Sequence, residues 1–526
     1  MNILKIILLN LLIFSFSYSS TFEELSSKLS DNSFKVKEDV LNELIINYKD
    51  EEKLEILLQN MLLGNLYFQN QSNEILFLQK DNSLKSLFTN STISNANQDE
   101  FSKVKINNKL RSVIKASLAK INLFASDENK RLKAAKNILE NLEVQDKEII
   151  LEALKSEKKS SIKDILLEAN TNLNAKFETG EEQLKAIEEL GGFLSSKSLE
   201  TLNSLKESND EKIKIAVSKA LKQIESSKTF YSFIETAFFG LSQGSVLLLA
   251  AIGLAITFGV MKVINMAHGE LIMIGAYTTY TIQQLMPNLI EYSIIIAIPA
   301  AFIVSGIVGI LIERLVIRHL YGRPLETLLA TFGISLILQQ VVRTIFSPLN
   351  QEVKTPSWMS GALEINSALS LTYNRLYVVI FAFIVFFAIL YVMKKTSLGL
   401  KVRAVSQNRP IARAMGIQSS KIDAITFGIG SGIAGVAGVA LSQLTNVGPN
   451  LGQAYIVDSF MVVVFGGVGN LWGTLIAAFT LGEINKFIEP LAGAVLAKVI
   501  ILIFIILFIQ KRPRGLFPQK GRDAQD

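Results

Sequence analysis

The fold class is decided by the stretch TAFFGLSQGSVLLLAAIGLAITFGVM, residues 236–261, which carries no charged side chain. A run of about 20 apolar residues is long enough to cross the hydrocarbon core of a bilayer as a helix. The sequence therefore predicts an all-α, polytopic membrane region. Further uncharged runs lie at 271–290, 292–312, 327–342, 376–393, 424–457 and 459–482, and a last apolar run lies at 490–510.

Composition separates this region from the rest of the 526-residue chain, which is 49% hydrophobic and 19% charged. The net charge is +8 from residue 231 onward and −2 before it. Positive loops beside apolar spans are a signal of membrane topology, so we exclude nucleic acid as a partner. The chain has no cysteine and only His268 and His319. A disulfide, a thiol nucleophile and a histidine-rich metal centre are therefore excluded, and we expect no cofactor.

Residues 1–20 have the pattern of a secretory signal peptide. Lys5 supplies a positive start, residues 6–16 an apolar run, and residues 17–20 a small-residue end. The run is too short to span about 30 Å of hydrocarbon, although a signal anchor is the alternative. We therefore expect residues 21–230 to form an exported domain.

The exported segment is rich in Lys, Glu, Ser and Leu, with apolar residues at helical spacing. KRLKAAKNIL at 130–139 aligns with KIKIAVSKAL at 212–221, and looser relatives occur at 33–45 and 181–194. Short helix pairs of this kind resemble HEAT or armadillo-like repeats, which bury an apolar face by stacking on their neighbours. We expect a nearly all-helical domain, with an irregular helical bundle as the alternative.

Lysine and arginine predict the orientation of the membrane region. Residues 394–421 contain seven of them and no acidic residue, and should face the cytoplasm together with 314–323 and 511–522. Residues 349–374 mix acidic and basic side chains with Pro and Ser and are expected outside. The N-terminal domain is then periplasmic and the C-terminus cytoplasmic. This threading gives an odd number of full crossings and requires one apolar stretch that enters the membrane and returns.

Glycines interrupt two apolar stretches. In residues 458–482, DSFMVVVFGGVGNLWGTLIAAFTLG, they follow a short apolar run, which makes this the best candidate for the returning element. In residues 263–277, VINMAHGELIMIGAY, polar side chains flank Gly269. Broken helices need protein or a polar cavity to satisfy their peptide groups, and by analogy with secondary carriers they mark transport paths. The predicted path residues are Asn265, His268, Glu270, Asp458, Gly466, Gly467, Gly469 and Asn470.

Plainer roles fit several of these side chains. His268 and Glu270 are typical of a cap or an interfacial turn at the start of a helix. Asp458 is also an ordinary helix start, although an acid inside a membrane span is costly. Lys498, in the last apolar run, is expected to snorkel to the interface and to contribute little.

Signatures of enzymes are nearly absent. The sequence contains no GxxxxGK[ST] and no HExxH motif. Its one GxSxG motif, GLSQG at 240–244, opens a long apolar span instead of a strand-to-helix turn. Small residues that allow close helix packing are the better interpretation. We therefore expect neither an enzyme nor nucleotide hydrolysis by this chain.

At INMAHGELIMIGAY, NRPIARAMGI and VVVFGGVGNLWG the chain resembles the permease subunits of branched-chain amino-acid-type ABC transporters, over residues 235–516. LAITFGVMKVINMAHGE and residues 431–474 are similar to the urea-transporter branch of that family. The resemblance implies a bacterial inner-membrane permease domain at 231–516, with about eight transmembrane segments, and a cytoplasmic tail at 517–526. The implied partners are a second related permease, two cytoplasmic ATPases and a periplasmic urea-binding protein. The role of residues 21–230 is not settled by the family.

The resemblance also gives the basic loop a role. In ABC permeases a short cytoplasmic helix docks into a cleft on the ATPase, and NRPIARAMGI at 408–417 resembles this coupling helix. Pro410 fits the first turn and Gly416 can end the helix. Arg409 and Arg413 would meet acidic groups on the partner. A positive-inside loop without a partner is the alternative. The expected apolar contact face is Ile411, Ala412, Met415 and Ile417.

The leading functional hypothesis is therefore the permease of a urea-importing ABC system. The alternative within this class imports branched-chain amino acids or short amides. Neutral urea needs only hydrogen-bond donors and acceptors, which suits the sparse charge of the spans, whereas charged substrates need buried ion partners. A stand-alone urea channel would need no coupling helix, and a membrane-tethered sensor would need only one span.

Overall fold

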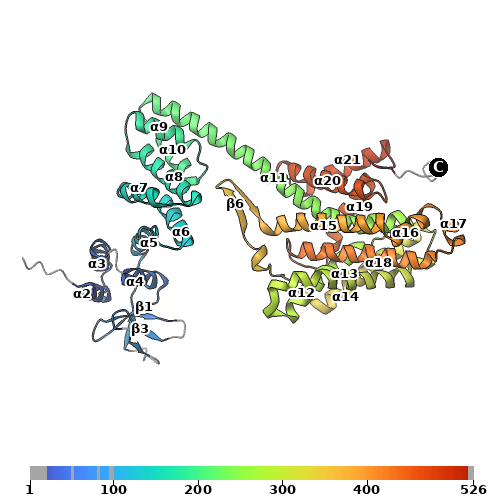
Figure 1. The fold of residues 1–526 in the computed structure, drawn as a ribbon, viewed down its shortest axis with the longest axis horizontal. Coiled ribbons are helices and arrows are strands. Elements are labelled where there is room, and N and C mark those ends of the chain that lie inside the picture. Colours follow the sequence, from blue (N-terminus) through green and yellow to red (C-terminus); the bar gives the residue numbers. More distant parts are fainter. Residues whose placement is uncertain (1–20, 49–51, 80–82, 90, 94–99, 519–526) are drawn as a thin grey trace, which may run out of the picture. The chain divides into compact units, whose positions relative to one another are not determined.

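The computed structural model describes residues 21–48, 52–79, 83–89, 91–93 and 100–518. The predicted signal peptide and residues 519–526 of the predicted tail lie outside the described residues. The chain divides into two compact units, residues 1–227 and 228–526, which meet within one long helix, α11 (Glu211–Met261) (Figure 1). Each unit is described by itself.

The N-terminal unit contains short helices and one small sheet. Its helices are α2 (Phe22–Ser27), η1 (Lys28–Ser30), α3 (Phe34–Asn47), α4 (Glu52–Leu63), α5 (Asn108–Asn122), α6 (Glu128–Glu140), η2 (Val144–Asp146), α7 (Lys147–Ser156), α8 (Ser160–Phe177), α9 (Glu181–Leu190), α10 (Ser196–Leu205) and the start of α11. Its strands are β1 (Leu66–Gln69), β2 (Ile75–Leu78), β3 (Leu84–Ser86), β4 (Thr92–Ile93) and β5 (Phe101–Lys103).

The sheet corrects the expectation of an all-helical exported segment. Its five antiparallel strands are ordered β4-β3-β2-β1-β5, and Leu66 of β1 pairs with Phe77 of β2. The strands are rich in the apolar and aromatic residues that pack well on a pleated surface. Leu66 and Ile75 are buried in one core with residues of α3, α4 and α5. The sheet is thus an integral part of the first half of this unit.

The second half of the unit is a stack of helices. Three of the four segments noted in the sequence are helical, in α6, α11 and α3, and the fourth, 181–194, is helical up to Leu190 in α9. One core joins α5, α6, α7 and α8, and the next joins the end of α8 to α9, α10 and α11. Helix α8 supplies Leu173 to the first core and Ala175 to the second. Cores shared between neighbouring layers are what a helical repeat requires, and the HEAT or armadillo-like assignment stays a prediction.

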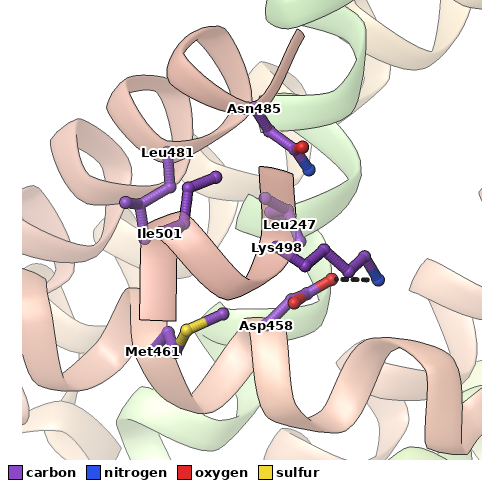
Figure 2. A pocket seen from close by; sticks show the side chains of 7 residues that line it. All are labelled: Leu247, Asp458, Met461, Leu481, Asn485, Lys498 and Ile501. Carbon is purple, nitrogen blue, oxygen red and sulfur yellow. Dashed lines mark ion pairs between the residues drawn. The ribbon is translucent and has the colours of Figure 1, made fainter. Parts of the chain in front are cut away.

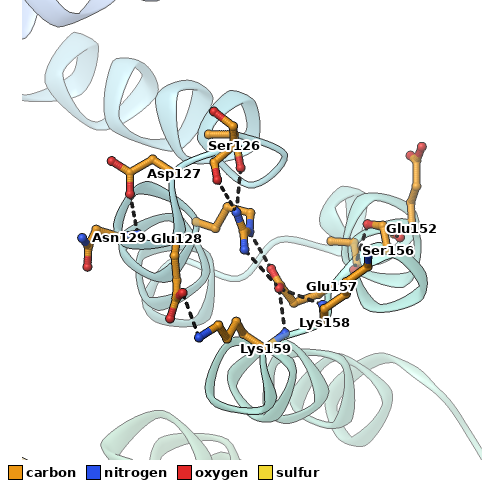
Figure 3. Close-up of polar contacts among 12 residues, drawn as sticks. Ser126, Asp127, Glu128, Asn129, Glu152, Ser156, Glu157, Lys158 and Lys159 are labelled. Atoms are coloured by element: carbon orange, nitrogen blue, oxygen red, sulfur yellow. Dashed lines mark hydrogen bonds and ion pairs between the residues drawn. The ribbon is translucent and has the colours of Figure 1, made fainter.

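Two helix junctions in this stack are clamped by an ion pair. Arg131 Nε donates to Glu157 Oε2 over 2.8 Å, and Arg131 Nη1 donates to the carbonyl oxygens of Ala125 and Ser126 over 2.9 Å each. Glu157 Oε1 also accepts the backbone amides of the next two residues, which Figure 3 shows beside it. The Arg131 hydrogen bonds hold the pKa of Glu157 at about 2, below its usual 4.5. The pair therefore links the α5–α6 turn to the α7–α8 turn.

The clamp predicts acid sensitivity of this unit. Because the pKa of Glu157 is depressed on folding, its stabilisation is present above pH 4.5 and is lost as the pH falls toward 2. The loss is worth about 1 kcal/mol, because water screens an ion pair near the surface. The protection of α6 against hydrogen exchange in the full chain, corrected for the intrinsic exchange rate at each pH, should fall across this window. Glu157→Gln should lower this protection at pH 7 and remove most of its pH dependence, whereas Glu200→Gln, in an exposed ion pair, should change neither.

The second unit is built from long helices. They are the rest of α11, then α12 (His268–Leu285), η3 (Pro287–Leu289), α13 (Ile290–Leu315), η4 (Ile317–His319), α14 (Pro324–Phe346), η5 (Ser357–Met359), α15 (Tyr373–Lys395), α16 (Ser397–Gln407), α17 (Arg409–Ala414), α18 (Ser419–Ser442), α19 (Leu451–Gly466), α20 (Leu471–Ala492) and α21 (Ala494–Lys511). A two-stranded hairpin, β6 (Ala362–Asn366) and β7 (Leu369–Thr372), lies in the loop expected outside.

Six helices in the described part of the chain are long and apolar enough to cross a membrane: α11, the segment Pro287–His319 around α13, α14, α15, α18 and α21. The apolar windows of α11 and α18 are 89% buried, whereas those of the other four are 17–33% buried. Helices α11 and α18 therefore form the centre, and the other four present apolar surface to the surroundings. This is the architecture of a multi-pass membrane protein.

Contacts at the helix ends define two ends of this unit. At one, called the basic end, the turn 316–323 meets α17, where the Arg409 guanidinium lies 4.2 Å from the Tyr321 ring centre. At the other, called the hairpin end, Arg343 Nη2 donates to Asn450 Oδ1 over 2.8 Å and Gln351 pairs with Val447. Helix α19 begins at the hairpin end, so its last residue lies toward the basic end.

The structure corrects the bounds expected for the returning element at the glycine break. Helix α19 starts at Leu451, before Asp458, and α20 continues to Ala492, well beyond 482. The break is thus the turn of a helical hairpin with arms of 16 and 22 residues. The interpretation of GLSQG is confirmed. Its two glycines lie within α11, where a Cβ at Gly240 would meet Glu483 of α20 and one at Gly244 would meet Phe479.

Candidate functional site

The coupling-helix candidate forms the six-residue helix α17 at the basic end. Asn408 caps it, because its Oδ1 accepts the Ile411 amide over 3.1 Å, and Pro410 lies in the first turn. Gly416 ends it with a φ of 83°, and hydrogen bonds from Gly416 to Arg413 and from Ile417 to Ala412 complete the terminating turn. The predicted helix start and stop are therefore confirmed.

The structure exposes only part of the contact face expected on α17. Arg409 does not point to solvent: its Nη1 and Nη2 bind Asp423 at 2.5 and 3.0 Å. Arg413 Nε donates to Ser419 over 2.7 Å, and Ala412 is buried. These contacts fasten α17 to the start of α18. The exposed side chains include Ile411 at 61%, Met415 at 78% and Arg413.

The glycine break between α19 and α20 is covered by the segment after α21. Leu516 N donates to Phe465 O over 2.8 Å, and Phe517 N donates to Gly466 O over 3.2 Å. Gly467 and Gly469 have φ angles of 103° and 77°, which favour glycine. Asn470 Oδ1 caps α20, accepting the amides of the second and third residues after it at 3.1 and 3.2 Å. The predicted break exists, and several of its peptide groups are hydrogen-bonded to protein.

The polar residues at the start of α12 contact different neighbours. His268 Nε2 lies 3.0 Å from Ala250 O of α11. Glu270 Oε1 instead accepts from Ser335 at 2.9 Å and Gln339 at 2.7 Å, both on α14. Asn265 Oδ1 accepts the Ala267 amide, in a turn that starts the helix. All three predicted path residues are buried, and each retains one polar atom without a hydrogen-bond partner in the described structure.

Asp458 lies elsewhere, in a small hollow between α11, α19, α20 and α21 (Figure 2). Its Oδ2 pairs with Lys498 Nζ over 3.0 Å. The expectation that Lys498 only snorkels is therefore wrong. The hollow is open to the surroundings, and the 260 Å³ of empty space in and around it is not an enclosed cavity. The residues that line it are Leu247, Asp458, Met461, Leu481, Asn485, Lys498 and Ile501.

Lys498 and Asn485 are the site residues that sequence reasoning missed. Lys498 was visible as the one charge inside the last apolar run, but its partner is 40 residues away in the sequence. Asn485 had no signal of its own, because it lies in a polar turn of α20 with Glu483 and Lys486. No group of three His, Cys, Asp or Glu side chains that could hold a metal ion occurs in the described residues.

Comparisons with known proteins agree with this architecture. Residues 236–509 match the family described as branched-chain amino acid transport system, permease component. The chain is 28% identical over 296 residues to the high-affinity branched-chain amino acid transport system permease protein BraD of Pseudomonas aeruginosa, covering 54% of this chain and 96% of that protein. It is 29% identical over 301 residues to LivH of Escherichia coli, covering 55% and 97%.

More distant similarity extends to the ribose import permease protein RbsC of Escherichia coli, 26% identical over 299 residues, with 54% of this chain and 88% of that protein covered. No solved structure matches. The relatives are transport permease components and not enzymes, as expected from the absence of enzyme motifs. The matched segment begins within α11 and ends in α21, so it includes the helical hairpin, the hollow and α17. This chain belongs to the family of permease components of branched-chain amino acid transport systems.

Proposed function

We propose that this chain is the membrane permease subunit of an ABC importer that moves a small polar solute, driven by ATP hydrolysed on partner subunits. The observation that carries the proposal is α17. Its backbone is fixed by the Arg409–Asp423 pair and by caps at both ends, yet Ile411 and Met415 stay exposed. A rigid helix that presents apolar side chains outside the membrane spans is suited to docking a partner protein. The partners are two ATPases, a second permease and a periplasmic binding protein.

The orientation is part of this proposal. Arg and Lys dominate the basic end, whereas Glu291, Glu352 and Glu364 lie at the hairpin end. The positive-inside rule then places the basic end in the cytoplasm and the exported domain, after removal of its signal peptide, in the periplasm.

Single cysteines test the orientation, because the natural chain has none. Ile365→Cys in β6 and Ser420→Cys at the start of α18 are both exposed. In intact cells with a permeable outer membrane, a membrane-impermeant thiol reagent should label Ile365→Cys and spare Ser420→Cys. Both should be labelled in lysed cells, which is the control. The reverse labelling pattern would show that the membrane region has the opposite orientation.

Two observations bear on the solute. The sequence resembles the urea branch of the family, which makes urea the first candidate. The relatives are named for branched-chain amino acids, and the Asp458–Lys498 pair supplies the two charges that a zwitterion needs, so an aliphatic amino acid is the second. Uptake of labelled urea and labelled leucine by cells that produce the chain with its partner subunits decides between them. Uptake that persists without the ATPases would contradict the proposal.

The proposed path follows α19. Asp458 lines the hollow, and the break at 466–470 lies at the end of the same helix. From Asp458 to Gly467 the helix rises by about 13 Å, so the two features would lie at different depths of one route. The tail segment that covers the break would move aside when the path opens inward. Asn265, His268 and Glu270 are retained in this proposal as residues that reach the path only in another conformation.

A further inference from the structure

The hollow holds an arrangement of polar groups that the fold itself does not use. Asn485 is 7% exposed, and its amide has no hydrogen-bond partner within the described residues. Figure 2 shows Asn485, Asp458 and Lys498 reaching toward the same hollow from α20, α19 and α21. An amide that lines an open hollow can both donate to and accept from a ligand there.

The ion pair beside Asn485 also faces an opening. The Lys498 side chain is 48% exposed, although it lies in the first turns of an apolar helix, whereas the Asp458 side chain is 11% exposed. An ionisable residue within a membrane helix lies against protein or a water-filled cavity and not against hydrocarbon. The side of α21 that carries Lys498 is therefore lined by water or by a second subunit, which gives a solute a way in.

We propose that Asp458, Lys498 and Asn485 form a binding site for a small solute that presents N–H donors together with a carbonyl or carboxylate acceptor. This inference rests on the proposed function. It adds a specific binding site to the transport path proposed above. The Asp458 carboxylate and Asn485 Oδ1 accept the N–H groups, while Lys498 and Asn485 Nδ2 donate to the acceptor. Urea and the zwitterionic end of an amino acid share this chemistry. The remaining walls, Leu247, Met461, Leu481 and Ile501, are apolar and suit an aliphatic side chain.

Binding exchanges one ion pair for two contacts of the same kind. In the structure the charges of Asp458 and Lys498 neutralise each other, so neither is left alone in the low dielectric of the membrane. A solute that inserts between them keeps both charges compensated and adds a partner for Asn485. A solute with only donors or only acceptors would leave one charge unpaired. The site thus selects a solute that has both donor and acceptor groups. When the site is empty, the ion pair joins α19 to α21.

Asn485→Leu tests the site without breaking any contact seen in the structure. We expect the half-saturation concentration for uptake to rise about tenfold, since one hydrogen bond to the solute is lost, with unchanged amounts of chain in the membrane. Thr426→Val is the matched control. Its hydroxyl is also buried and unpaired, but on α18 away from the hollow, so uptake should stay as in the wild type. Wild-type affinity in Asn485→Leu would overturn the site.

The double variant Asp458→Asn with Lys498→Gln distinguishes between the two kinds of solute that share this chemistry. Labelled leucine and labelled urea are used in parallel arms. If the solute is a zwitterion, its half-saturation concentration should rise about a hundredfold, whereas urea, which needs no charge, should lose about tenfold or less. A wild type that takes up neither solute would overturn the assigned ligand class. Uptake of either solute without the ATPases would contradict only the proposed function. The site variants would still test the binding site.

Discussion

Replacing Met415 with aspartate should reduce ATP-dependent uptake by about a hundredfold or more, with the same amount of chain in the membrane. Met415 is 78% exposed and follows the last residue of α17, so the change breaks no contact within the chain. A charge placed in the apolar centre of a docked interface is left unpaired and desolvated, which costs several kcal/mol. Stimulation of the partner ATPase by solute should be lost together with uptake.

A matched substitution at the other end separates docking from general damage. Ile365→Asp also replaces an exposed apolar residue with a carboxylate, but in β6 at the hairpin end, and it should leave uptake and ATPase activity nearly unchanged. Ala412→Asp is a different case, because Ala412 is buried and its variant should reduce the folded amount. Normal uptake by Met415→Asp would remove α17 from energy coupling and leave a plain positive-inside loop.

Helix α17 shows what local sequence can predict. Pro410, Gly416 and the cap at Asn408 act on their own backbone neighbours, so the helix and both its ends were predictable. Which side faces outward was not, because Arg409 is turned inward by Asp423, 14 residues later. A pattern of charges four residues apart contains no information about a carboxylate on another helix. Arg409 is therefore turned away from any partner, whereas two members of the expected apolar face, Ile411 and Met415, are exposed and Ala412 is buried.

The same limit explains the hollow and the sheet. Asp458 and Lys498 were both noticed, yet each was assigned a solitary role, since their pairing depends on how α19 and α21 pack. The strands of the N-terminal unit are two to four residues long and interrupt a composition that elsewhere forms helices. Periodicity over so few residues cannot separate strand from helix. The spans were predicted correctly in type because their signal extends over about 20 residues each.

The helices that carry these sites are packed through close contacts between their backbones. Helix α18 carries glycines on several faces. A Cβ at Gly430 would meet Gly253 O of α11 at 2.7 Å, and one at Gly432 would meet Phe302 O of α13 at 2.8 Å. On the α12 side, a Cβ at Gly438 would overlap Ile272 O and would lie 2.7 Å from Ala276 N. In a membrane, where lipid tails are as apolar as the side chains, such close packing is a main source of helix association.

Gly438→Val should therefore lower the folded, membrane-inserted amount of the chain at least about tenfold. The new Cβ meets backbone atoms of α12, which cannot move aside as a side chain can, and overpacking of this kind typically costs 1–3 kcal/mol or more. Gly333→Val is the control, because a Cβ there meets nothing within 4 Å, and it should behave as the wild type. Size-exclusion chromatography of a fluorescently tagged chain measures both. If Gly438→Val elutes as a normal, monodisperse species at wild-type yield, α12 and α18 do not pack this closely. The positions described for His268 and Glu270 on α12 would then also be wrong.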